Sequence, residues 1–158
     1  MRLEKREIIL ALEAEIARES AIIAKAARDA REAATHEESK PENDKDTRGL
    51  EQSYLARGQA QRVAENEAAI GDVNALALRE FGPKASIAMS ALVTVDEDGT
   101  ELVVFLSPAG GGNVLAGGVQ VVTPSSPLGR ALLGKKVDDD VELQLPGKLR
   151  SFVVSAIA

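Results

Sequence analysis

The chain of 158 residues has no cysteine, no tryptophan, a single histidine and only 3% aromatic residues. The lack of cysteine excludes a disulfide framework and a thiolate metal site. With one histidine, His36, no nucleophile-and-base constellation for covalent catalysis stands out. A core must therefore consist mainly of alanine, valine, leucine and isoleucine, and 44% apolar residues are enough to fold one.

Long apolar runs are missing as well. No stretch approaches the roughly 20 residues that a membrane span needs. The start of the chain carries charges throughout, unlike the bare apolar core of a signal peptide. The net charge of -6 argues against wrapping the nucleic-acid backbone. We therefore expect a soluble, cytoplasmic protein whose partner is a protein with a positive surface.

The first half of the sequence has the pattern of two long helices. Residues 2–34 contain no glycine or proline, and their aliphatic side chains recur at helical spacing before the stripe narrows to alanines. A second run over about 50–78 has an apolar face on which we place Ala60. Pro41 and Gly49 bracket the segment between the runs, where the chain is expected to reverse. This half, residues 1–80, is predicted to form an antiparallel coiled-coil hairpin.

The second half, residues 81–158, has a different composition, rich in valine, leucine, serine, threonine and glycine. The runs "SIAMSALVTV" and "TELVVFL" around "DEDG" predict two strands and a turn. A third strand, a short serine-capped helix ending near Gly134 and a final hairpin around "PGK" follow. The loop "AGGGNVLAGG" lacks the Lys-Ser/Thr of a phosphate loop, so we expect a flexible loop. The predicted fold class is α+β.

Acidic residues crowd the turn near 37–48, between the two predicted helices. Such a turn is most often solvated surface. A calcium loop starting at Glu42 is excluded, because its sixth position is Thr47 instead of glycine and its twelfth is Ser53 instead of glutamate. The acidic run 138–140 is expected to be a charged surface turn at the start of a strand.

One motif has a specific likeness to a known family. The segment 119–147 contains "SPLGRALLGK", residues 126–135, between a valine-rich strand and an acidic turn followed by a Pro-Gly hairpin. This arrangement resembles the C-terminal domain of the bacterial GreA/GreB transcript-cleavage factors. The resemblance implies a coiled-coil hairpin joined to an FKBP-like C-terminal domain, the same order of halves that the periodicity predicts.

The resemblance also implies a function. Members of the family bind RNA polymerase through the C-terminal domain and insert the tip of the coiled coil into the secondary channel. Carboxylates at the tip help to hold a second Mg²⁺ in the polymerase, which then cleaves its own backtracked RNA at the 3' end. The chain is then not an enzyme itself. It needs no cofactor of its own, and we expect a monomer.

The family's Glu-Asn pair at the tip aligns with Glu42 and Asn43, whereas its aspartate falls on Ser39. The candidate catalytic carboxylates are Glu38, Glu42, Asp44 and Asp46. Of these, Glu42 and Asp44 are the candidates for contact with the metal shared with the polymerase. The expected docking surface on the C-terminal domain comprises Leu132, Leu133, Lys135 and Lys136, or an adjacent strand edge.

Three other functions remain open. A Gre-like protein that enters the channel could inhibit or tune the polymerase without cleavage. A regulator of the Rnk type shares the C-terminal domain but has a shorter coiled coil. A prolyl isomerase would need an open pocket lined by aromatic side chains, for which this half offers Phe105 and Phe152.

Overall fold

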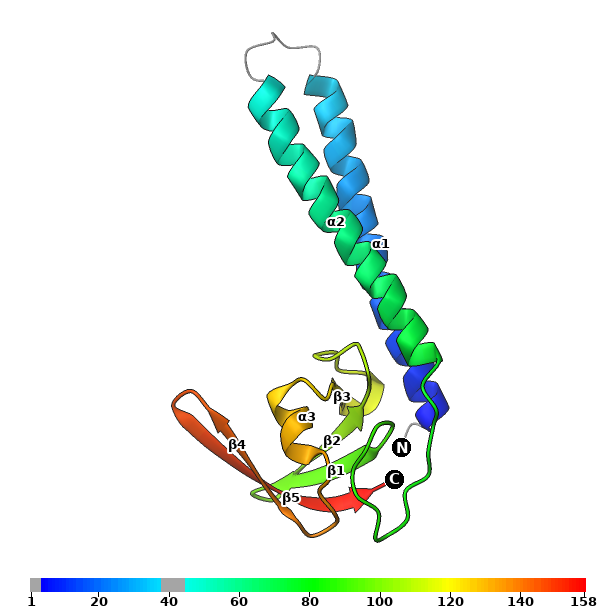
Figure 1. Cartoon of the computed structure of the whole chain (residues 1–158), viewed down its shortest axis with the longest axis vertical. Coiled ribbons are helices and arrows are strands. Elements are labelled where there is room, and N and C mark those ends of the chain that lie inside the picture. Colours follow the sequence, from blue (N-terminus) through cyan, green and yellow to red (C-terminus); the bar gives the residue numbers. More distant parts are fainter. Residues whose placement is uncertain (1–3, 38–44) are drawn as a thin grey trace.

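The computed structural model describes residues 4–37 and 45–158, and their side chains over 4–33 and 56–158. Two long helices pack as an antiparallel hairpin that rises from a small α+β domain (Figure 1). The first, α1, spans Lys5–Glu37 and the second, α2, spans Lys45–Asn74. No helix among these residues has both the length and the apolar character that crossing a membrane requires.

The elements of the C-terminal domain follow in chain order. They are β1 (Leu92–Glu97), β2 (Thr100–Leu106), the 3₁₀ turn η2 (Ala116–Gly118), β3 (Val119–Val122), α3 (Pro127–Leu132), β4 (Asp140–Leu145) and β5 (Lys148–Ile157). The five strands form one sheet in the order β3-β2-β1-β5-β4. All neighbours are antiparallel except β2 and β3, which are parallel. The sequence prediction of an α+β fold with a helical N-terminal half is confirmed, although the run before β1, residues 85–91, is not a strand.

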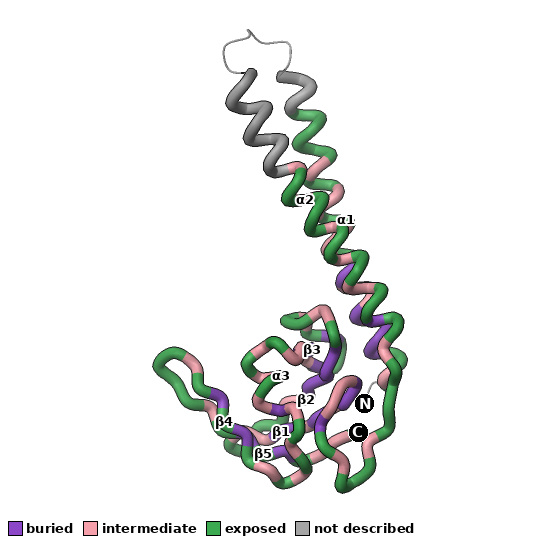
Figure 2. Tube along the Cα trace, viewed as in Figure 1, coloured by how far each residue is buried: buried purple, intermediate pink, exposed green. Residues whose placement is uncertain are grey.

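The side chains of each strand contribute alternately to two hydrophobic cores, because successive side chains point to opposite faces of a sheet. In β2, Val104 belongs to a core that α3 covers, whereas its neighbour Phe105 belongs to a core on the other face. The second core is completed by the base of the hairpin, where Ile8, Leu12 and Ile16 of α1 are buried. Among the described side chains of the hairpin, the buried ones lie at this base (Figure 2). The hairpin and the sheet are therefore joined by a shared core.

Two details of the hairpin differ from the sequence prediction. Gly49 lies inside α2 instead of at the turn, because a helix tolerates one glycine at a cost of about 1 kcal/mol. Pro41 lies outside the described residues. Ala60 is exposed, so it does not face α1 as expected. The partly or fully buried stripe of α2 follows alternating steps of three and four residues, at Ala56, Gln59, Val63, Asn66, Ile70 and Val73. Apolar periodicity placed Val63, Ile70 and Val73 correctly on this stripe. It chose Ala60 in place of its neighbour Gln59, because the stripe member at that level is polar.

The short helix α3 is fixed at its start by local hydrogen bonds. The Ser126 side chain accepts a hydrogen bond from the Gly129 amide at 3.0 Å and donates one to the Thr123 carbonyl at 2.8 Å. Pro127 occupies the first turn, where a missing amide hydrogen costs nothing. Gly134 follows the helix with a φ of 83°, the left-handed conformation typical of a helix end. The predicted serine cap is confirmed.

Candidate functional site

In the sequence, the acidic candidates lie between the end of α1 and the first turn of α2. Glu38, Glu42 and Asp44 lie outside the described residues. Asp46 belongs to the first turn of α2, and its side chain is not described. The end of α1 at Glu37 and the start of α2 at Lys45 are remote from the C-terminal domain (Figure 1). The direction in which these carboxylates point stays a prediction.

The docking residues predicted on α3 and just after it are only partly at the surface. Leu132 has 0% exposure and belongs to the core between α3 and the sheet, so it offers no contact area. Leu133 is half-buried and packs against the same core. Lys135 is half-buried and Lys136 is exposed. The prediction is wrong for Leu132 because a short helix must turn one face toward the sheet. The sequence alone does not tell which of its leucines lies on that buried face.

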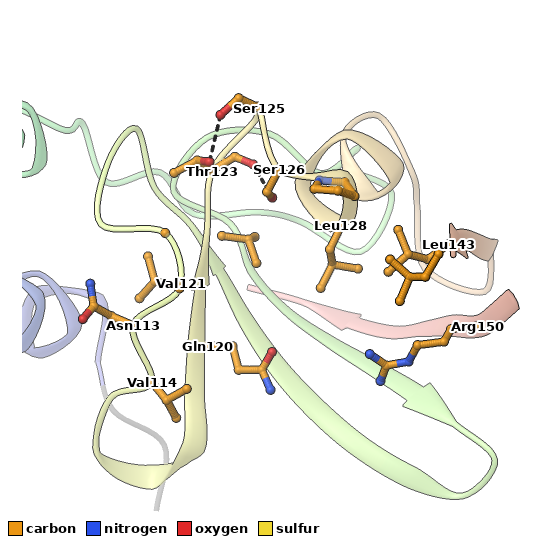
Figure 3. A pocket seen from close by; sticks show the side chains of 15 residues that line it. Asn113, Val114, Gln120, Val121, Thr123, Ser125, Ser126, Leu128, Leu143 and Arg150 are labelled. Atoms are coloured by element: carbon orange, nitrogen blue, oxygen red, sulfur yellow. Dashed lines mark hydrogen bonds between the residues drawn. The ribbon is translucent and has the colours of Figure 1, made fainter. Parts of the chain in front are cut away.

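A pocket of about 570 Å³ opens on the same domain, between the loop 109–118, β3, α3 and the hairpin of β4 and β5. Figure 3 shows its side chains converging from these elements. Its aliphatic wall includes Val114, Leu128, Leu143 and Leu145. Its polar groups include Asn113, Gln120, Ser125 and Arg150. Sequence reasoning missed this pocket because its residues come from four separate segments.

Arg150 is the one charged residue among the described residues that line the pocket. Its Nε and Nη2 donate to the two carboxylate oxygens of Glu97, each at 2.8 Å. Its guanidinium carbon also lies 4.9 Å from the ring centroid of Phe152. Hydrogen bonding from Arg150 holds the pKa of the Glu97 carboxyl below its ordinary value. The guanidinium is therefore held in one orientation at the pocket.

The glycine-rich loop 109–118 is tied to β3, contrary to the flexible loop that we expected. The Gly112 amide donates to the Val121 carbonyl at 3.0 Å, and the Val121 amide donates to the Asn113 carbonyl at 2.9 Å. Gly110 also abuts α1, since a β-carbon there would lie 2.7 Å from Leu12 Cδ1. The loop thus covers the edge of the sheet and forms one side of the pocket.

The pocket does not have the lining that an isomerase would need. Phe105 and Phe152 are 0% and 1% exposed and belong to two different cores. Neither of them lines the pocket, and no other aromatic residue of the described chain does. The open pocket lined by Phe105 and Phe152 that a prolyl isomerase would need is therefore not formed.

The acidic run 138–140 forms a turn with a structural role. Asp138 has a φ of 74°, and its amide donates to the Val154 carbonyl at 2.7 Å. The Asp139 carboxylate accepts a hydrogen bond from the Lys136 amide at 2.8 Å. Within 4–37 and 45–158, no cluster of three histidine, cysteine or acidic residues could hold a metal ion.

These features define a class of protein in which a long helical hairpin and a small α+β domain share a core at the base of the hairpin. Residues 82–158 match the family model described as "Transcription elongation factor, GreA/GreB, C-term". Residues 82–158 thus form a domain of the GreA/GreB C-terminal type, as the motif at 126–135 predicted.

Similar proteins come from several bacteria. The transcription elongation factor GreA of Zymomonas mobilis subsp. mobilis is 47% identical over 36 residues, which is 23% of this chain and 23% of that relative. The match thus spans less than a quarter of the relative's length. The GreA factor homolog 1 (Gfh1) protein of Thermus thermophilus is 25% identical over 94% of this chain and 95% of its own, with a TM-score of 0.41. The Thermus aquaticus Gfh1 structure is 25% identical over 93% and 94%, with a TM-score of 0.42.

Proposed function

We propose that this chain binds RNA polymerase through its C-terminal domain and inserts the tip of its hairpin into the secondary channel, where it stimulates cleavage of backtracked RNA. The observation that carries the proposal is the union of a GreA/GreB C-terminal domain with a hairpin of two helices, of 33 and 30 residues. At about 1.5 Å per residue, α1 is on the order of 50 Å long. Among the described side chains of α1, the buried ones end at Ile16, and the helix continues for about 30 Å beyond that residue.

The acidic segment at the tip would supply the chemistry. Mg²⁺ prefers carboxylate oxygens and water, and a pair of metal ions stabilises the attacking and leaving oxygens in phosphodiester cleavage. Glu42 and Asp44 are the proposed contacts with a Mg²⁺ ion of the polymerase, with Glu38 and Asp46 as further candidates. In this role the chain is not an enzyme and binds no cofactor of its own. It acts on the nascent RNA only through the polymerase, and a cytoplasmic location follows from that partner.

A second candidate is a factor that enters the channel and slows or tunes the polymerase without cleavage. It is favoured by Ser39, which stands where the tip of the cleavage factors carries an aspartate. One metal-directed carboxylate would then have to come from a neighbouring position. An Rnk-type regulator is disfavoured, since its coiled coil is shorter than helices of 33 and 30 residues provide.

The test uses a stalled, backtracked elongation complex that carries end-labelled RNA. Adding the full chain is expected to shorten the RNA, and the Glu42→Ala/Asp44→Ala variant is expected to bind the polymerase without shortening it. Slower elongation with RNA of unchanged length would favour the second candidate. If the parent chain neither shortens RNA nor alters elongation, both proposals are wrong.

A further inference from the structure

We infer that the hairpin consists of two parts that open separately. The base stays folded with the sheet, whereas the outer hairpin, residues 20–37 of α1 and 45–66 of α2, opens and closes as one unit. The boundary between the two parts is a polar layer that Ser20 and Asn66 form in the interface between the helices. This opening belongs to the chain on its own and does not rest on the proposed function.

The base is held by apolar burial against the domain. Leu12 and Ile16 of α1 and Val73 of α2 are buried in one cluster with Phe105 of the sheet. Among the described side chains of α1 after Ile16 and of α2 before Val73, none is buried (Figure 2). Because apolar burial is the dominant favourable contribution to folding, the base can open only together with this side of the domain.

Ser20 and Asn66 lie where this apolar contact ends. The Ser20 Oγ and the Asn66 Nδ2 are buried, and neither has a hydrogen-bond partner among the described residues. Two hydrogen-bonded pairs give the register of the helices: Glu19 with Arg62, and Glu13 with Asn74. Ser20 and Asn66 fall between these two registers, so they lie at about the same level. Both groups regain hydrogen bonds to water when the helices separate, and the layer therefore favours opening at this level.

The outer hairpin has few contacts that hold it closed. Apart from Ile23 and Val63, its half-buried side chains beyond the polar layer are small or polar, namely Ala24, Ala27, Ala56 and Gln59. Its part of α2 also contains Gly49 and Gly58, and glycine weakens a helix interior relative to alanine. Helices in proteins owe most of their stability to packing, so each outer helix depends on the other. Loss of the interface should therefore release both together.

The opening has a consequence for the tip. A partner that encloses the two packed helices binds only the closed form and so suppresses the opening. This consequence rests on the proposed function, because it takes the secondary channel as the enclosing partner. Contacts made by the C-terminal domain would leave the opening unchanged, since the base stays folded in both forms.

Hydrogen exchange of the free full-length chain, followed residue by residue by NMR, tests the inference. Amides of the outer hairpin in α1 and in α2 should share one protection factor, at least about tenfold below that of the amides at the base. The change should occur as a step at the level of Ser20 and Asn66. A gradual decline from the base to the tip would indicate fraying, and equal protection throughout would indicate a single unit. Either result would overturn the inference.

Two substitutions test whether the polar layer sets the boundary. Asn66→Leu in α2 and Ser20→Ala in α1 each remove an unpaired buried group, so each should raise the protection of the outer amides several-fold, in both helices and without a change at the base. Ala64→Leu is the control, because it places leucine at an exposed position of α2 near the layer, and protection should stay within about twofold of the parent. A response confined to the substituted helix, or an equal response at the base, would contradict a separate outer unit.

Discussion

At the scale of single residues, the Glu97 and Arg150 pair links the sheet to the pocket. Glu97 lies at the end of β1 and Arg150 lies in β5, so the pair joins adjacent strands beside the open pocket. Both side chains are about a quarter exposed, which limits the stability that the pair contributes. Its main effect is to hold the guanidinium in place.

The pair predicts a measurable change in titration. Hydrogen bonding from Arg150 lowers the pKa of Glu97 below its ordinary value of 4.5. A lowered pKa means that the stability gained from the pair is present above pH 4.5 and is lost as the pH falls through the lowered pKa. We expect Arg150→Gln to raise the NMR titration midpoint of the Glu97 carboxyl toward 4.5. An unchanged midpoint would show that the pair does not form in solution.

Gly129 of α3 occupies a position that has no room for a side chain. A β-carbon at this position would lie 1.9 Å from the Thr123 carbonyl oxygen, which belongs to the backbone and cannot easily move. Gly129→Ala should therefore lower the free energy of unfolding by at least about 1–3 kcal/mol. Gly71→Ala is the control, because Gly71 is also helical but has nothing within 4 Å, and alanine there should stabilise by about 0.5–1 kcal/mol. Urea denaturation measures both changes, and equal effects of the two substitutions would contradict the steric argument.

The positions of some residues in the fold could be predicted from local residue preferences alone. The Ser126 cap, Pro127 after it and Gly134 at the helix end follow from the preferences of individual residues, and all three were placed correctly. Leu132 was not, because its burial depends on how α3 sits on the sheet. The pairing of Arg150 with Glu97 spans 53 residues of sequence, and no local pattern predicts it.

At the scale of elements, the hairpin is held by a thin interface. The Asn66 amide nitrogen and the Ser20 hydroxyl are buried without a protein hydrogen-bond partner among the described residues. A buried polar group without a partner is destabilising, and a polar residue at a coiled-coil core position lowers stability in general. The outer hairpin is thus less stable than its base, where Ile8, Leu12 and Val73 are fully buried.

The interface predicts different outcomes for two substitutions to leucine in α2. Asn66→Leu should raise the free energy of unfolding by about 1 kcal/mol, since it replaces an unpaired amide with an apolar side chain in the stripe. Ala60→Leu should leave it within about 0.5 kcal/mol of the parent, because Ala60 is exposed. Thermal melting of the full chain followed by circular dichroism tests both. A strong destabilisation by Ala60→Leu would mean that it faces α1 after all.

The elements themselves were largely predictable. Strict alternation marks β4, where Val141 and Leu143 are buried between exposed neighbours. In β1 the buried Val93 and Val95 alternate with half-buried neighbours. The stripe of α2 was harder to find because polar Gln59 and Asn66 occupy two of its positions. The bonding of the glycine-rich loop to β3 was missed, since glycine gives no pleated side-chain pattern to detect.

At the scale of the whole molecule, the hairpin and the domain are not independent pieces. Phe105, Val119 and Val121 of the sheet are buried in one cluster with Ile8 and Leu12 of α1. Lys5 of α1 reinforces the junction, because its ammonium donates to the Arg79 carbonyl and lies 4.7 Å from the Phe81 ring centroid. A fragment limited to the second half would expose this face of the sheet. Docking is therefore best measured on the full chain, and the rigid base sets the direction of the hairpin.

If activity depends on the distance between the C-terminal domain and the tip of the hairpin, shortening the hairpin should abolish activity without weakening polymerase binding. The Glu19 carboxylate pairs with Arg62 at 3.0 Å, and the Asn74 side-chain amide donates to Glu13 at 3.0 Å. Because the helices are antiparallel, residues 20–26 of α1 lie at about the level of 58–64 of α2, midway between the registers that the two pairs give. Deleting these two segments of seven residues keeps the helical phase of the remaining stripe. The deletion moves the tip about 10 Å toward the domain and leaves every tip carboxylate in the chain. The shared core at the base is untouched, so polymerase binding should stay within about twofold of the parent. RNA shortening in backtracked complexes should disappear, since Mg²⁺ ligands must lie within about 2 Å of the ion. Activity retained in the shortened chain would mean that the tip does not act at the metal, whatever its carboxylates do.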